Sequence, residues 1–396
     1  MSSKKGSLIT DLGVRLVWSS CAPSVPRARI MGLHPWQKTC FAFLCFAVFN
    51  LGLNEFNPWA LKAGQFPGFA FPALYGMFHM LFSCVAALII MRCVQKPEAG
   101  YPSFAQLYQY LDGLATIGLC NALNVVLNNL SLTLVSLFVN QVIKSSSPMP
   151  TIVFEHLLTG KRFSIAVITS VVCICVGAVL APWFKVSQVN QSGGEASSVL
   201  GILSVIVAML ASSLKPVVAM VMMSGTKDRP KLEPTVILFY DCALSFCFMF
   251  VYWIVSYERY DSIQYLVNAP VNAPYLEGYN TSLIGLGIIF AGSMMAFSFN
   301  LSTYYYVMLA SALGSMIGSI GLKVLVICVA AVQAGVSDPI TIFGIAIVAV
   351  SICAYAGFAY RDSCLAEEAA AASGAEAKGS GGPEGAKASE ATPLKG

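Results

Sequence analysis

Long apolar stretches separated by short polar segments occupy most of this chain. A helix needs about 20 predominantly apolar residues to cross a bilayer. Ten stretches are of that order: residues 37–55, 69–91, 104–126, 131–156, 164–184, 198–223, 235–256, 282–304, 307–333 and 339–360. The pattern predicts an all-α membrane protein with ten transmembrane helices.

The composition agrees with this fold class. The 396 residues are 57% hydrophobic and only 11% charged, with a mean hydropathy of +0.73, whereas soluble domains carry about 25% charged residues. The 13 cysteines form no C-x-x-C pair, and the three histidines are far apart in sequence. We therefore expect no metal site, no cofactor and no disulfide framework. The sequence also shows no pair of acidic residues and no nucleophile with a base that would suggest a catalytic site, so we do not expect an enzyme.

The positions of Lys and Arg predict how the chain is oriented. If the N-terminal tail is cytosolic, most of the 23 basic residues lie in cytosolic tails and loops. The opposite side then holds only Lys62, Lys185 and Arg259. This asymmetry follows the positive-inside rule and places both termini in the cytosol.

Polar segments flank the membrane domain at both ends of the chain. Residues 1–35 are basic and lack the apolar core of a secretory signal, which favours a cytosolic tail, with a transit peptide as the alternative. Residues 36–362 form the ten-helix domain. Residues 363–396 have almost no large apolar side chain to bury, so we expect a disordered cytosolic tail.

Two N-x-S/T sequons lie in loops on the non-cytosolic side. They begin at Asn190 and Asn280, which makes these two residues candidate glycosylation sites. Their use would place that side in a secretory lumen. The alternative is that so short a motif occurs here by chance.

Three lysines lie inside predicted spans: Lys144, Lys215 and Lys323. A lysine at the centre of a spanning helix costs about 2.5–3.5 kcal/mol on insertion scales, and such residues usually mark a functional site. We therefore expect an anion that enters the membrane domain. The structural alternatives are that Asp112 neutralises Lys144, that Lys323 snorkels to the lumenal surface, and that Lys215 pairs with Asp241.

Polar side chains that could bind an anion's oxygens surround Lys144. On a helix, Gln141, Lys144 and Ser145 share one face, and Asn140 lies one turn before Lys144. Ser147 follows just before a proline. We expect these hydroxyl and amide groups to line the anion site.

Acidic and aromatic candidates lie on other predicted helices. Asp112 and Asp241 are candidates for proton coupling or an ion pair. The run Tyr304 to Tyr306 is explained by an interfacial aromatic belt or by a surface that stacks on a base or sugar. In the second case Tyr305 would contact the substrate.

The regions after Lys144 and Lys323 resemble each other. Each lysine is followed by the rest of its helix, a short loop and a further apolar helix that carries Cys175 or Cys353 at a similar distance. Five predicted helices separate the two units, and an odd offset means opposite orientation. The chain therefore looks like two inverted halves, about 36–184 and 198–360, which places a substrate site near the bilayer midplane where the halves meet.

Several motifs resemble the triose-phosphate and nucleotide-sugar translocator family of the drug/metabolite transporter superfamily. The most specific are Asn129-Leu130-Ser131-Leu132 and the stretch from Val139 to Pro148, which reads V-N-Q-V-I-K-S-S-S-P. Leu232-Glu233-Pro234 with Phe239-Tyr240, and the segment from Phe71 to Ser83, are similar to the starts of the family's seventh and second helices.

This resemblance implies ten helices in two inverted repeats and the exchange of phosphorylated solutes. It also implies that Lys144 and Lys323 bind phosphate. Plastid sugar-phosphate members have Arg after the second lysine, whereas this chain has Val324. That difference favours the nucleotide-sugar-like branches, whose members exchange a nucleotide sugar for a nucleoside monophosphate.

The resulting hypothesis is an alternating-access antiporter in a Golgi or ER membrane. Its partners would be the phosphorylated substrate, the counter-substrate and membrane lipid. We expect no nucleic acid partner, and the sequence allows a homodimer without requiring one. The alternatives are a plastid-envelope translocator that exchanges phosphate for a sugar phosphate or phosphoenolpyruvate, and a membrane scaffold or receptor that transports nothing.

Overall fold

A computed structural model describes most of the chain, and all of its regular structure is helical. The described residues are 35–61, 66–94, 104–135, 140, 143–181, 199–225, 230–267, 278–333 and 338–379. Eight helices in this part are long and apolar enough to cross a membrane. The prediction of an all-α membrane protein is therefore confirmed.

The observed helices follow the predicted spans closely. The eight long apolar helices are α1 (Pro35–Ala60), α2 (Pro72–Ile89), α3 (Phe104–Leu134), α8 (Val199–Ser224), α9 (Pro234–Val255), α11 (Thr281–Ala310), α12 (Ala312–Gln333) and α13 (Pro339–Gly379). The shorter elements are α5 (Pro148–Thr159), α6 (Ile165–Leu180), α10 (Glu258–Leu266) and a π-helix, η1 (Ile90–Val94). Proline begins α2, α5 and α9, where its missing N–H leaves no intrahelical bond unmade.

Two segments differ from the sequence-based expectation. The single helix predicted over 131–156 is divided, because α3 continues to Leu134 and α5 begins only at Pro148. At the other end, α13 continues to Gly379, so residues 363–379 are helical where we expected a disordered tail. This stretch is rich in Ala and Glu, which are strong helix formers. Residues 380–396, like 1–34, lie outside the described residues.

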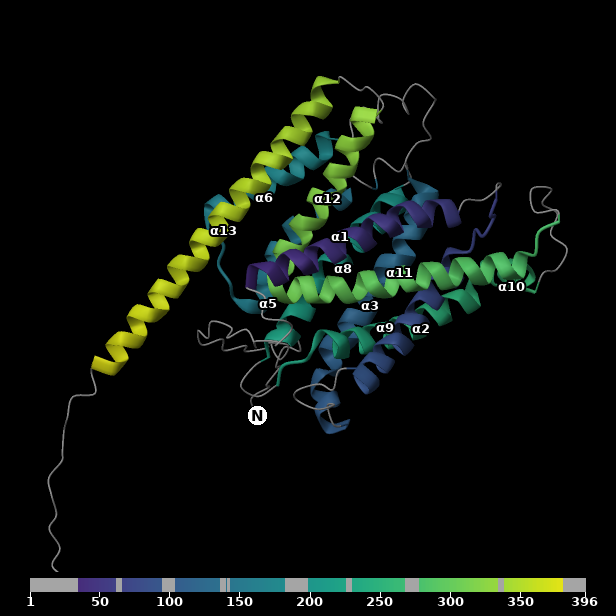
Figure 1. Cartoon of the computed structure of the whole chain (residues 1–396), viewed down its shortest axis with the longest axis horizontal. Coiled ribbons are helices and arrows are strands. Elements are labelled where there is room, and N and C mark those ends of the chain that lie inside the picture. Colours follow the sequence, from purple (N-terminus) through teal and green to yellow (C-terminus); the bar gives the residue numbers. More distant parts are fainter. Residues whose placement is uncertain are drawn as a thin grey trace, which may run out of the picture.

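The helices pack in pairs that join the two predicted halves. The contacts are α3 with α8, α1 with α11, α2 with α9, and α6 with α13. Each predicted span of the first half has a counterpart five spans later: α1 corresponds to α8, α2 to α9, α3 to α11 and α6 to α13. Replacing every helix by its counterpart reproduces the same four contacts. The packing is therefore compatible with an inverted repeat. Figure 1 shows α13 beside α6 and extending well beyond the bundle.

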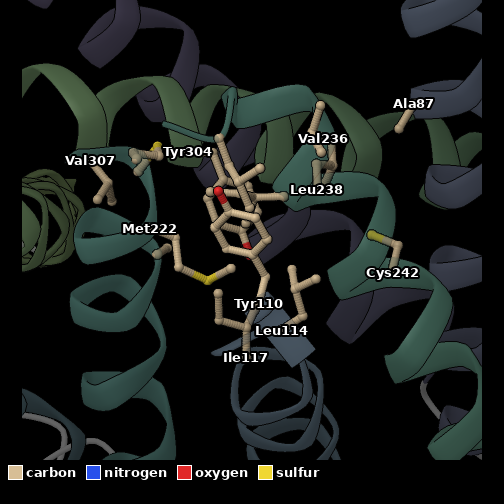
Figure 2. Packing of buried hydrophobic residues seen from close by; sticks show 14 of the residues in the cluster. Ala87, Tyr110, Leu114, Ile117, Met222, Val236, Leu238, Cys242, Tyr304 and Val307 are labelled. Carbon is tan, nitrogen blue, oxygen red and sulfur yellow. The ribbon is translucent and has the colours of Figure 1, made fainter. Parts of the chain in front are cut away.

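A large apolar cluster fills one end of the bundle, next to the segment 225–233 that connects α8 to α9. Figure 2 shows Tyr110, Met222, Val236 and Tyr304 packed together there. They come from α3, α8, α9 and α11, so the ends of four spans meet in one core.

The opposite end of the bundle is tied together by the short helix α10, which was not among the predicted helices. The Glu258 carboxylate accepts a hydrogen bond from the Ala73 N–H at 2.8 Å, at the start of α2. The Tyr265 hydroxyl donates to the Pro67 carbonyl at 2.7 Å, and the Thr281 hydroxyl donates to the Tyr265 carbonyl at 2.8 Å. Helix α10 therefore links the first turns of α2 and α11.

Candidate functional site

The chain leaves regular helix geometry directly after Lys144. Pro148 and Pro150 have no N–H, so the carbonyls of Lys144 and Ser146, four residues earlier, lose their α-helical donors. Each carbonyl instead accepts from the residue three positions after it, at 3.2 Å and 3.1 Å respectively. The prediction of one continuous helix over 131–156 was wrong because these two prolines break it. Lys144 consequently sits at a helix interruption.

Lys144 lies four residues before α5, which packs against α12, the helix that carries Lys323. Both side chains are half-buried, and they are close enough for their positive charges to repel each other. The ion pairs in the described part of the chain, Lys161–Glu155 and Lys215–Asp241, involve neither of them. Two neighbouring ammonium groups therefore have no neutralising carboxylate among the described residues.

A stripe of amides on α3 leads to this break. Asn121, Asn124, Asn128 and Ser131 are spaced three, four and three residues apart, so they share one helix face. The Asn140 amide donates to the Ser131 hydroxyl at 2.7 Å and to the Asn128 side-chain oxygen at 3.3 Å. The Asn124 side-chain oxygen is buried and has no partner among the described residues. The spacing of the stripe is visible in the sequence, although its asparagines on α3 were not among the predicted site residues.

The serines predicted to surround Lys144 are inside the protein. Ser145 and Ser147 are both buried. The Ser147 carbonyl accepts a hydrogen bond from the Ser213 hydroxyl of α8 at 3.0 Å, which joins the helix break to the second half of the chain. Gln141 lies outside the described residues.

Lys215 and Asp241 meet in a buried network. The Lys215 Nζ lies 2.8 Å from Asp241 Oδ2, and the Tyr304 hydroxyl donates to the same oxygen at 2.7 Å. The Ser245 hydroxyl donates to Oδ1 at 3.1 Å, and the Asn121 amide donates to Ser245 at 3.0 Å. The structure thus forms the ion pair that the sequence offered as an alternative and adds partners from α3 and α11.

The remaining candidates are more peripheral. Tyr305, the tyrosine predicted from the sequence to contact the substrate, is half-buried. Its neighbour Tyr304 is the tyrosine that donates to Asp241. Tyr304 and Asp241 are 63 residues apart in the chain, so no local pattern links them. Asp112 has an exposed side chain on α3.

Of the two candidate glycosylation sites, one falls within the described residues. Asn280 is exposed and caps α11, where its side-chain oxygen accepts from the Leu283 N–H at 3.1 Å. Its amide group is therefore part of a helix cap as well as of a sequon. Asn190 lies outside the described residues.

Comparison with known proteins identifies the family. Residues 79–349 match the family model described as "UAA transporter family". This chain belongs to the UAA transporter family. The sequence-based resemblance to the triose-phosphate and nucleotide-sugar translocators is thereby confirmed, and this UAA-family chain is a membrane transporter rather than an enzyme.

The related sequences are plant proteins. One probable sugar phosphate/phosphate translocator of Arabidopsis thaliana is 26% identical over 182 residues, which are 46% of this chain and 53% of the relative. The match therefore spans about half of that protein's length. A second probable sugar phosphate/phosphate translocator of A. thaliana is 27% identical over 305 residues, 75% of this chain and 74% of its own. A crystal structure of a protein aligns with 81% of this chain and 98% of its own, at 13% identity and a TM-score of 0.49.

Proposed function

We propose that this UAA-family protein is an alternating-access antiporter that binds the phosphate groups of its solutes with Lys144 and Lys323. The solutes are a nucleotide sugar and, in exchange, a nucleoside monophosphate. The observation that carries this proposal is the pair of neighbouring half-buried lysines without a carboxylate partner among the described residues. Lysine is a common phosphate binder, since its ammonium offers three donors around a point charge.

The same pair of charges supports exchange rather than one-way transport. Without a bound anion, two like charges face each other in a medium of low dielectric constant, where Coulomb repulsion is strong. A phosphate group neutralises them, so the loaded carrier is stabilised more than the empty one. We infer that the carrier changes its opening more readily with an anion bound than without one, which couples the entry of one solute to the exit of another.

The helix break at Lys144 supplies a site for such an anion. Broken helices in transporters occur where backbone lines a binding cavity near the midplane. Asn140 and the buried serines Ser145 and Ser147 lie on either side of Lys144. The serine hydroxyls can bind phosphate oxygens that the two lysines do not reach, while the Asn140 amide, which donates to two side chains of α3, holds this segment against that helix.

A second candidate function is the exchange of a sugar phosphate for inorganic phosphate. The specific observation in its favour is that both Arabidopsis relatives are named as probable sugar phosphate/phosphate translocators. Val324, where plastid sugar-phosphate members have Arg, favours the nucleotide solutes. For the first function we propose a Golgi or ER membrane with cytosolic termini, and for the second a plastid envelope.

Reconstitution into liposomes preloaded with nucleoside monophosphates, phosphate or sugar phosphates distinguishes these functions. Uptake of labelled UMP, GMP or phosphate is measured for wild type, Lys144→Ala and Lys323→Ala. We expect nucleotide exchange that is lost in both variants and retained in Arg92→Ala, which removes an exposed cation. Phosphate exchange without nucleotide exchange supports the second function. Full exchange by both lysine variants contradicts the proposed site, and the absence of any exchange by folded wild-type protein favours a scaffold or receptor.

A further inference from the structure

The end of the bundle where α8 ends and α9 begins is closed by both apolar and polar contacts. The apolar cluster shown in Figure 2 fills the space between α3, α8, α9 and α11. The Tyr110 hydroxyl donates to the Pro230 carbonyl at 2.7 Å, and the Leu232 N–H donates to the Met222 carbonyl at 3.1 Å. A solute can pass this end only if these helices separate.

One ion pair spans the helices that would have to separate. Lys215 belongs to α8, Asp241 to α9 and Tyr304 to α11, and all three groups meet at one carboxylate oxygen. The Asp241 side chain is fully buried and that of Lys215 is 17% exposed. Removing one partner of such a pair is strongly destabilising, because a buried charge is left without compensation.

The two partners differ in what they retain when the pair breaks. The Asp241 carboxylate still accepts hydrogen bonds from Tyr304 and Ser245. The Lys215 ammonium has Asp241 as its only ion-pair partner among the described residues and lies 5.5 Å from the Tyr304 ring centre. When the pair breaks, Asp241 thus keeps two hydroxyl donors, whereas Lys215 keeps no anion in the described part of the chain, and an incoming anion can supply one.

We propose that Lys215, Asp241 and Tyr304 form a gate at this end of the bundle, which we call the α8–α9 gate. The phosphate group of an arriving solute opens it by replacing Asp241 as the partner of Lys215. The identity of this trigger rests on the proposed function, but closure of the gate in the empty protein does not. Lys215 thus contacts the solute on entry, while Lys144 and Lys323 hold it.

Native cysteines report on this gate. Cys242 and Cys120 are buried, and Cys242 directly follows Asp241 in α9. Cys93 is exposed and follows α2 at the same end of the bundle. Full-length protein in detergent is treated with a charged methanethiosulfonate reagent, and the rate at each cysteine is read by site-resolved mass spectrometry. Cys93 then measures access of the reagent, and Cys242 measures opening of the gate.

We expect the gate to open when its charge is removed or when phosphate is added. Asp241→Asn and Lys215→Met should each raise the modification rate of Cys242 at least about tenfold, because either change breaks the pair, and should leave Cys93 unchanged. Loss of the anion and loss of the cation change the reactivity of a nearby thiol in opposite directions, so a rise in both variants reports opening of the gate. In wild type, UMP or inorganic phosphate should raise the Cys242 rate as well. The double variant Lys215→Met with Asp241→Leu keeps an apolar contact between the helices and should fold, but its Cys242 rate should no longer respond to phosphate.

Two outcomes overturn the proposal. If Asp241→Asn leaves Cys242 as protected as in wild type, the pair does not close the gate. If the double variant retains the response of Cys242 to phosphate, Lys215 is not the group that senses the solute. A failure of the proposed function would be recognised differently, as solute exchange that persists in Lys144→Ala. Protection of Cys242 in the empty protein is measured without solute and does not depend on that result.

Discussion

Replacing Gly292 by alanine should disturb the contact that joins α1, α2 and α11. Gly292 lies in α11 and faces the Tyr75 ring of α2. A Cβ at position 292 would lie 2.6 Å and 2.7 Å from two Tyr75 ring carbons, and closer still to the hydroxyl oxygen. That hydroxyl donates to the Asn57 side-chain oxygen of α1 at 2.9 Å, and the ring packs against His79 with 3.8 Å between centroids and an angle of 59° between the ring planes. Tyr75 would have to move and give up the bond to Asn57.

The magnitude follows from three contributions. Overpacking at a well-packed site costs about 1–3 kcal/mol, and loss of the Tyr75–Asn57 hydrogen bond costs about 0.5–1.5 kcal/mol. The higher helix propensity of alanine offsets about 0.5–1 kcal/mol. The net loss is about 2 kcal/mol, which lowers the melting temperature by about 4–8 °C at 2–4 °C per kcal/mol.

Thermal unfolding in detergent, followed with a dye that reacts with newly exposed cysteines, measures this loss. The matched control is Gly287→Ala in the same helix, where a Cβ has nothing within 4 Å, so its melting temperature should stay level or rise. Tyr75→Phe should be destabilising in wild type and nearly neutral in Gly292→Ala, because the hydrogen bond is already lost there. Equal melting temperatures for the two glycine variants would refute the reasoning.

Three further predictions concern the site and its supports. Pro148→Ala restores an N–H for the Lys144 carbonyl, so we expect a straighter helix and solute exchange reduced about tenfold or more, with no loss of melting temperature. Ser311 separates α11 from α12 at φ 73°; Ser311→Val should lower stability by about 1–3 kcal/mol, whereas Ser311→Gly should change the melting temperature little. Burial raises the pKa of Glu258, so the folded state binds a proton more readily than the unfolded state. Stability should therefore increase as the pH falls through the raised pKa, and Glu258→Gln should remove this increase in melting curves recorded across that range.

The sequence was sufficient for the elements that depend on local composition. Apolar length located every long helix, although α3 and α13 continue well beyond their predicted ends, and the insertion cost of charge singled out the lysines. The Lys215–Asp241 contact was among the alternatives because both residues lie near the same expected end of adjacent helices.

Three-dimensional contacts explain what the sequence could not supply. The break after Lys144 was missed although Pro148 is visible, because apolar length alone does not distinguish one helix from two. Tyr304 reaches Asp241 from a helix 63 residues further along the chain. Helix α10 is too short and polar to resemble a span, and the bonds from Glu258 and Tyr265 to the start of α2 cross nearly 200 residues of sequence.

The amide stripe on α3 also has a consequence for how the protein is made. The span in α3 has a mean hydropathy of 1.4, against 2.1 in α8 and 2.3 in α13, because one face carries asparagines instead of apolar side chains. Amides in a membrane helix are stabilised by partners on neighbouring helices. The Asn121 amide donates to the Met80 sulfur of α2 at 3.4 Å and to the Ser245 hydroxyl at 3.0 Å, and the ribosome adds Ser245 more than a hundred residues after Asn121. During synthesis α3 must therefore remain in contact with the insertion machinery or with the helices made before it. Its amide face is covered only after the second half of the chain has been synthesised.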